Sequence, residues 1–299
     1  MYSCGFSTVP VSKEERSYYN LPMIKRIYIE ITNICDLHCP FCTRTVRPSA
    51  SMTPSFFHDI LRQAVTVTPH IYLHVQGEPL LHPQFDEILS ICDKEHAVVH
   101  LVTNGSFLDA HPDLLAHSSL SGIAVSLQSV SARPSERIPA YYESVMKLAG
   151  NASQHGSVNV DLRFWRSDGL LEPNTAWCLT HLRDSYEFMP TARKNSFRIL
   201  PHVYVSFAND FTWPSAGDAD SSEGTCLGGR TQIAILSDGT AVPCCLDSDG
   251  LIPLGSLKTE TLALIMKKPR YLSLVQGFEQ HRITESLCRK CTFRRRFDH

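Results

Sequence analysis

The stretch Cys35-Asp36-Leu37-His38-Cys39-Pro40-Phe41-Cys42 places three thiols within eight residues, directly after the run RIYIEIT at 26–32. That run is rich in β-branched residues, which predicts a strand that ends at the cysteines. Three thiolates can hold three irons of a [4Fe–4S] cube and leave the fourth iron open for a substrate or cofactor. We interpret the stretch as the ligand loop of an iron–sulfur cluster at which chemistry occurs.

Two other interpretations of this stretch are a structural zinc site that uses His38 as a fourth ligand, and three cysteines that bind no metal. Zinc sites usually combine paired C-x2-C halves, whereas a C-x3-C-x2-C run at a strand end is a narrow pattern. The pattern therefore favours a cluster held by Cys35, Cys39 and Cys42.

Outward from this loop, short β-branched runs alternate with longer amphipathic ones, which is typical of repeated βα units. We expect five further strands, at 71–76, 97–102, 122–127, 157–165 and 197–200. We expect helices at 54–65, 85–93, 141–149 and 174–184. Six units predict an α/β fold, a partial (β/α)6 barrel that is open and TIM-like, with its active site at the carboxyl ends of the strands.

The C-terminal part has a different composition. Residues rich in Asp, Ser, Gly and Pro predict a linker, and two short β runs around Ser237-Asp238-Gly239 predict a β-hairpin in a small domain that also contains a helix. We predict four segments: an N-terminal extension (1–25), the barrel (26–208), the linker (209–225) and the small domain (226–299).

The small domain contains a second set of thiols, Cys226, Cys244, Cys288 and Cys291. Two cysteines beside a hairpin and two on a C-x2-C turn can converge on one centre, either an iron–sulfur cube or zinc. Spacing alone does not choose between these metals, and Cys245 could act in place of its neighbour.

Charge and hydropathy exclude several classes of function. The net charge of −2 and the pI near 6.7 give no long-range attraction for nucleic acid or an anionic membrane. Only Arg294–Arg296 form a local basic cluster, so RNA modification has little support. No leader or membrane-spanning stretch is evident, and we expect a cytoplasmic protein with no membrane or nucleic-acid partner. Because thiols stay reduced in the cytoplasm, the 11 cysteines indicate metal centres rather than disulfides.

The Cys35-x3-Cys39-x2-Cys42 run, with Phe41 before the last cysteine, resembles the signature of the radical S-adenosylmethionine (radical SAM) superfamily. The resemblance implies that the open iron binds the amino and carboxylate groups of SAM. An electron from the cluster then breaks the sulfonium to give methionine and a 5′-deoxyadenosyl radical, which removes a hydrogen atom from a substrate.

Other segments resemble SAM-binding elements of this family. Gln76-Gly77-Glu78-Pro79 is similar to the GGEP segment, whose backbone and Glu meet the SAM amino group, with glutamine in place of the first glycine. Thr103-Asn104-Gly105 resembles the TNG turn near adenosine, although any buried strand can end in such a polar turn. Ser126 resembles a family position that meets the ribose. Arg163 resembles one that pairs with the SAM carboxylate, although it could equally be a surface arginine. The SAM-binding residues implied are Phe41, Gly77, Glu78, Pro79, Asn104, Ser126 and Arg163.

The second set of thiols resembles the twitch domain, a shortened relative of the SPASM domain that carries one auxiliary [4Fe–4S] cluster. The match of Gly239-x4-Cys244 favours Cys244 over Cys245 as a ligand. The implied cofactors are two [4Fe–4S] clusters and SAM, with Cys226, Cys244, Cys288 and Cys291 around the auxiliary cluster.

The resemblance implies a radical SAM enzyme, of the oxidoreductase or peptide-maturase type, that modifies a small molecule or a ribosomal peptide. Its partners would be that substrate and an electron donor such as a reductase, flavodoxin or ferredoxin. The alternative is a non-catalytic iron–sulfur or zinc binding module, which would neither bind nor consume SAM. The sequence names no catalytic acid or base and no substrate.

Overall fold

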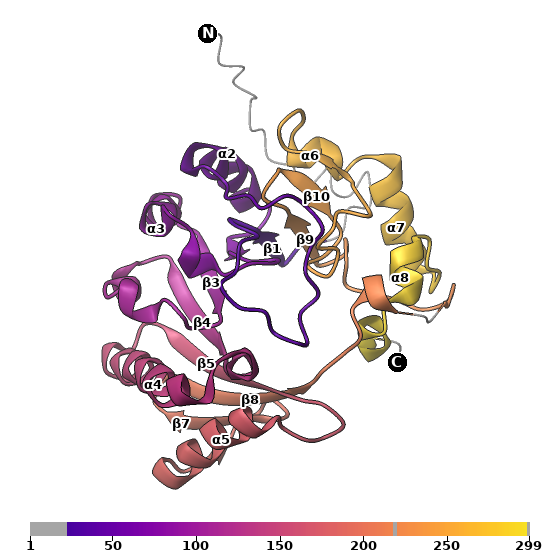
Figure 1. Cartoon of the computed structure of the whole chain (residues 1–299). Helices are drawn as coiled ribbons and strands as arrows, with labels where there is room; N and C mark the ends of the chain where they lie inside the picture. Colours follow the sequence, from indigo (N-terminus) through magenta and orange to yellow (C-terminus); the bar gives the residue numbers. More distant parts are fainter. Residues whose placement is uncertain (1–22, 218–219, 298–299) are drawn as a thin grey trace.

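A computed structural model describes residues 23–217 and 220–297, so the predicted extension at 1–25 lies almost wholly outside the described residues (Figure 1). The barrel part of the sheet consists of six neighbouring parallel strands, which confirms the predicted partial barrel. These strands are β1 (Arg26–Ile29), β2 (His70–Tyr72), β3 (Val98–Thr103), β4 (Leu120–Ser126), β5 (Asn159–Arg166) and β8 (Val203–Asn209).

Four helices cover the outer side of the curved sheet (Figure 1). They are α2 (Pro54–Val65), α3 (Phe85–Lys94), α4 (Ile138–His155) and α5 (Pro173–Ser185). The start of α2 follows from local sequence, because Pro54 occupies the first turn and the Thr53 hydroxyl accepts a hydrogen bond from the Phe56 amide. Gly156, at φ 71°, ends α4 in the left-handed conformation that glycine adopts freely. Local signals therefore determine these boundaries.

The last barrel strand differs from the prediction. The run expected at 197–200 is β7 (Ser196–Leu200), which pairs antiparallel with β8 and with the short β6 (Met189–Pro190). Only Pro201 and His202 join β7 to β8, and so short a connection permits only antiparallel pairing. The sixth parallel strand is β8, and our assignment of 197–200 to that position was wrong.

The predicted hairpin is present and extends the same sheet. It consists of β9 (Gln232–Ile235) and β10 (Thr240–Val242), joined at Gly239 with φ 90°. Because β9 pairs in parallel with β1, the sheet continues from the barrel into the C-terminal part and ends at β11 (Gly255–Ser256). The hairpin is therefore held directly against the strand that leads to the first cysteines.

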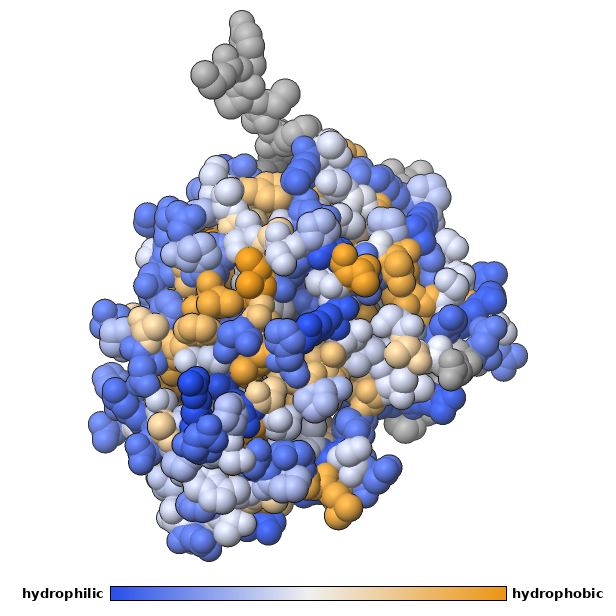
Figure 2. All heavy atoms as spheres, viewed as in Figure 1, coloured by the Kyte–Doolittle hydropathy of each residue, from blue (hydrophilic) through white to orange (hydrophobic). Residues whose placement is uncertain are grey.

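Three more helices follow the hairpin and lie at one side of the molecule (Figure 1). They are α6 (Leu262–Ile265), α7 (Pro269–Glu279) and α8 (Ser286–Lys290). Among the described residues, no helix is both long and apolar enough to cross a bilayer. On the face shown in Figure 2, apolar side chains form small separate patches within a largely hydrophilic surface.

Candidate active site

The first cysteines lie on a long loop, residues 33–52, that leaves the end of β1 and returns beside it. The Met52 amide donates to the Ile31 carbonyl at 2.7 Å. The Asn33 side chain donates to the Pro48 carbonyl at 2.9 Å and accepts from the Ala50 amide at 2.8 Å. In Figure 1 this indigo loop crosses the middle of the ring of strands. The fold thus holds the cysteines over the carboxyl ends of the strands, as predicted.

The three thiols approach the ends of the neighbouring strands. The Cys42 amide donates to the Cys39 carbonyl at 3.1 Å, which forms a turn between these two residues. The Cys42 thiol lies 3.6 Å from Gln76 Oε1, and Asn104 Nδ2 lies 3.7 Å from the Cys35 sulfur. The structure therefore brings together the cysteine loop, the QGEP segment and the TNG turn.

Protonation of these thiols follows from their surroundings. Burial by surrounding protein raises the pKa of Cys39 to about 12 and that of Cys42 to about 11, and raises that of Cys35 as well. Iron binds the thiolate form, so cluster assembly must displace protons. Within residues 23–217 and 220–297, no three His, Cys, Asp or Glu side chains converge on a single-ion site. In a cube each thiolate binds its own iron, so the three thiols need not converge on one ion.

Gly77 is required by the backbone beneath the loop. Its φ is +80°, and a Cβ atom there would lie 2.4 Å from the Thr32 carbonyl oxygen. The Glu78 amide also donates to the Ile34 carbonyl at 2.8 Å. The backbone at Gly77 therefore approaches the start of the cysteine loop closely, at Thr32 and Asn33.

Glu78 is almost fully buried, and its carboxylate is bonded within the protein. It accepts hydrogen bonds from the Thr103 hydroxyl at 2.7 Å, the Asn104 amide at 2.6 Å and the Leu80 amide at 3.0 Å. These contacts tie the QGEP segment to the TNG turn. Its two oxygens order the neighbouring turn, and its hydrogen bond to the SAM amino group stays a prediction.

The Glu78 carboxyl predicts a pH dependence of stability. Burial raises its pKa to about 7, against the opposing effect of three hydrogen bonds. A carboxyl with a raised folded-state pKa binds its proton more tightly when folded, so the free energy of unfolding falls as pH rises from about 4.5 to about 7. We expect wild type to lose about 3 kcal/mol more over this range than Glu78→Gln, measured by urea unfolding of the apoprotein.

A matched control is Glu143→Gln, which removes an exposed carboxyl from α4. That variant should keep the pH dependence of wild type. Parallel curves for wild type and Glu78→Gln would contradict the assignment of this titration to Glu78.

The remaining predicted SAM-binding residues lie on β4 and β5, on the cysteine loop and directly after Glu78. Ser126 ends β4 and pairs in register with Arg163 of β5. Arg163 is half-buried, and its Nε lies 3.2 Å from Asp161 Oδ2. The Phe41 ring lies 5.2 Å from that of Trp165, and its carbonyl accepts a hydrogen bond from Trp213 at 2.9 Å. Pro79 is buried and starts the 3-10 turn after Glu78.

A buried ion pair, which the sequence did not reveal, joins the cysteine loop to the C-terminal hairpin. Glu30 is 0% exposed and accepts two hydrogen bonds from Arg47, at 2.6 and 2.8 Å. The same carboxylate accepts from the Gln76 and Ser237 amides, each at 3.1 Å. Arg47 also donates to the Ser248 carbonyl at 2.7 Å. One carboxylate thus links β1, the cysteine loop, the QGEP segment and the hairpin.

The second set of thiols surrounds a cavity of about 290 Å³ beside β1. Arg26 and Tyr28 of the barrel contribute to its wall, as do Phe293 and Phe297 near the C-terminus. The cysteines that line it are Cys226, Cys244, Cys245, Cys288 and Cys291. The structure brings together all four predicted auxiliary ligands and adds a fifth thiol.

The two adjacent cysteines face different neighbours. Burial raises the pKa of Cys244 well above its ordinary value, and the charges of Cys245, Cys226 and Cys288 act in the same direction. Burial raises the pKa of Cys245 to about 11; this thiol packs against Tyr28 and the small apolar cluster around it, and Cys226 also acts on it. Cys288 is a neighbour of Cys244 in this comparison and Tyr28 is a neighbour of Cys245; the choice of Cys244 as the ligand stays a prediction.

The chain matches two family models, in the order expected for the barrel and the small domain. Residues 29–163 match the radical SAM superfamily model, and residues 226–292 match the model of SPASM, an iron–sulfur cluster-binding domain.

Two curated relatives extend this comparison. The PqqA peptide cyclase of Streptomyces rochei is 27% identical over 248 residues, which cover 72% of this chain and 68% of that protein. The GTP 3′,8-cyclase of a Synechocystis strain is 27% identical over 130 residues, 42% of this chain and 39% of that one. The match to the second relative therefore spans less than half of either protein.

Solved structures share the fold at low sequence identity. BtrN in complex with AdoMet and 2-DOIA has a TM-score of 0.55 at 14% identity, covering 91% of this chain and 94% of that one. SuiB of Streptococcus suis bound to S-adenosylmethionine has a TM-score of 0.55 at 16% identity, covering 93% and 73%. The protein anSMEcpe with AdoMet and the Cp18Cys peptide has a TM-score of 0.57 at 14% identity, covering 91% and 87%.

Proposed function

The chain belongs to the radical SAM superfamily and carries a SPASM-type iron–sulfur domain, and from this premise we propose that it cleaves SAM reductively to modify a peptide. The observation that carries the proposal is the meeting of the cysteine loop with Gln76 and Asn104. When bound, the first cluster supplies the electron that breaks the sulfonium of SAM. We propose Cys35, Cys39 and Cys42 as its ligands.

The residues around the loop would bind and orient SAM. The Gly77 backbone lies against the start of the loop, and the Gln76 and Gly77 carbonyl oxygens would accept hydrogen bonds from the SAM amino group. Glu78 holds the Asn104 turn in place through its three internal hydrogen bonds. Ser126 and Arg163 are neighbours on β4 and β5 and would meet the ribose and the carboxylate. These polar groups would fix the sulfonium next to the open iron.

A peptide is the favoured substrate class, because the PqqA peptide cyclase matches 72% of this chain. A small molecule is the second candidate, because the match to BtrN, solved in complex with 2-DOIA, spans 94% of that chain. The test is to incubate reconstituted enzyme with peptide pools and, separately, with 2-DOIA. A product that has lost two hydrogen atoms, formed together with deoxyadenosine, would identify the class. Turnover of 2-DOIA alone would overturn the choice of a peptide.

We propose one auxiliary [4Fe–4S] cluster, held by Cys226, Cys244, Cys288 and Cys291. Cys226→Ala combined with Cys288→Ala should lower the iron content from about eight to about four per chain, because one cube loses two ligands. SAM cleavage driven by dithionite should persist, because the first cysteines are untouched. Iron analysis and deoxyadenosine production measure both outcomes.

The matched control is Cys245→Ala, which removes the fifth thiol of the same cavity. It should retain about eight irons, as two cubes require. Unchanged iron content in the double variant would contradict the auxiliary site, and loss of iron in Cys245→Ala would assign Cys245 as a ligand.

A further inference from the structure

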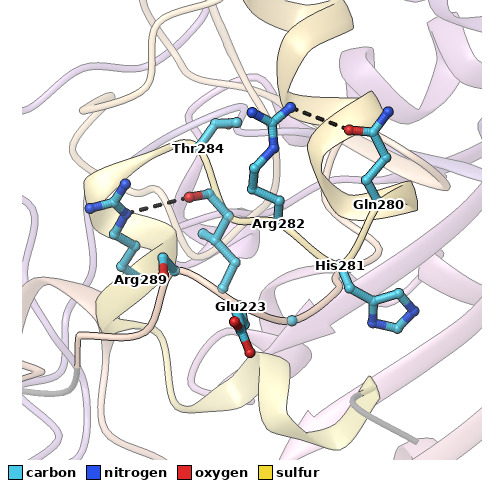
Figure 3. A pocket seen from close by; sticks show the side chains of 9 residues that line it. Glu223, Gln280, His281, Arg282, Thr284 and Arg289 are labelled. Carbon is cyan, nitrogen blue, oxygen red and sulfur yellow. Dashed lines mark hydrogen bonds between the residues drawn. The ribbon is translucent and has the colours of Figure 1, made fainter.

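A large open hollow lies on the C-terminal part of the molecule (Figure 3). Its volume is about 950 Å³, and residues 222–224, 280–284 and 289 form its walls. We call it the arginine hollow, after Arg282 and Arg289. Nothing in the SAM chemistry proposed above uses this surface.

Backbone hydrogen bonds hold the walls of the arginine hollow in place. The Gly224 amide donates to the His281 carbonyl at 2.9 Å, and the Ile283 amide donates to the Ser222 carbonyl at 2.8 Å. The Arg282 amide donates to the Gly277 carbonyl at 2.7 Å. The two segments therefore form one connected surface.

The lining of the arginine hollow carries an excess of positive charge, with two arginines and one carboxylate. Arg282 is exposed and donates to Gln280 Oε1 at 3.3 Å, and Arg289 donates to the Ile283 carbonyl at 3.4 Å. Neither guanidinium pairs with a carboxylate of the described chain. The hollow contains one carboxylate, Glu223, which points away from both arginines in Figure 3.

The arginine hollow is connected along the chain to the cavity lined by the auxiliary cysteines. Residues 222–224 lead directly to Cys226, and Arg289 immediately follows Cys288. Both cysteines line the auxiliary cavity. A protein seated in the hollow would therefore lie next to the segments that carry two of the proposed ligands.

Reductive SAM cleavage consumes one electron that the polypeptide does not itself supply. We propose that the arginine hollow is the docking site of an acidic electron-carrier protein, a flavodoxin or ferredoxin. The carrier gives up one electron for each SAM cleaved, and no bond forms between the two proteins. Contacts of this kind are small and depend on complementary charge, which fits unpaired arginines around an open hollow. The identification of the partner as an electron carrier rests on the proposed function, reductive cleavage of SAM.

The test compares binding and electron delivery in Arg282→Glu and wild type. The probe is a bacterial flavodoxin. We expect its affinity for the holoenzyme at low ionic strength to fall about tenfold in the variant, and the difference to shrink as salt is added. The rate of deoxyadenosine formation should fall with flavodoxin as reductant and stay unchanged with dithionite, which needs no docking site.

The matched control is Arg62→Glu, an equal charge reversal at an exposed position of α2. Arg289→Gln is a second variant, expected to weaken flavodoxin binding without reversing a charge. Equal flavodoxin affinity in wild type and Arg282→Glu would overturn the proposal, as would an equal loss in Arg62→Glu. If an acidic peptide lost binding in Arg282→Glu while flavodoxin did not, the hollow would be a peptide site instead. Absence of deoxyadenosine with dithionite would contradict the proposed function, and flavodoxin binding would still decide this proposal.

Discussion

Replacing Cys35, Cys39 and Cys42 together by alanine is expected to abolish deoxyadenosine formation from SAM. No other described thiols lie on the loop that meets Gln76 and Asn104, so no substitute ligands are at hand. Without these three thiolates the open-iron cube cannot form, and the iron content should fall from about eight to about four per chain. The measurement is liquid chromatography of deoxyadenosine after anaerobic incubation with SAM and dithionite.

The control for this experiment is Cys178→Ala, which removes a buried thiol from α5. That variant should keep both iron content and SAM cleavage. If the triple variant cleaved SAM reductively at the wild-type rate, the assignment of the cysteine loop would be wrong.

Removing the guanidinium of the buried ion pair should cause the largest loss of stability. Glu30 is inaccessible to solvent and Arg47 is its charged partner, so Arg47→Met leaves a buried carboxylate that keeps two backbone amide donors and has no countercharge. Breaking such a pair from one side costs about 3–5 kcal/mol. The hydrogen bond from Arg47 to the Ser248 carbonyl is lost as well. Urea unfolding of the apoprotein measures the change in the free energy of unfolding.

A second variant separates the unpaired charge from the loss of packing. Glu30→Gln in the Arg47→Met background removes the buried charge, and part of the stability should return. Exposed ion pairs typically contribute less than about 1 kcal/mol. If Arg47→Met lowered the free energy of unfolding by less than that, the pair would not hold the cysteine loop to the C-terminal hairpin.

The parts of the fold that could be predicted are those with local causes. The helix expected at 54–65 matches α2, because the residues that determine it are local. Thr53 caps its start, Pro54 occupies its first turn, and its apolar residues recur at helical spacing. The turn at Gly239 was predicted for the same reason. The role of β8 depends on pairing with β5, about forty residues earlier, and no local pattern distinguishes it from β7.

The candidate site also has parts that the sequence predicts and parts that it does not. The two sets of cysteines were recognised from spacing, and the structure gathers each set in one place. The Glu30–Arg47 pair escaped prediction, because a carboxylate on a strand and an arginine in a loop reveal no partnership until the chain is folded. The position of Cys245 in the auxiliary cavity likewise depends on Tyr28, which lies far from it in the sequence.

The most direct test of the account is iron, sulfide and deoxyadenosine analysis of the wild-type chain, reconstituted without oxygen and supplied with dithionite and SAM. The account predicts about eight irons per chain, as two cubes require, together with deoxyadenosine. Zinc in place of iron, or iron without any cleavage of SAM, would contradict it and favour a non-catalytic metal-binding module.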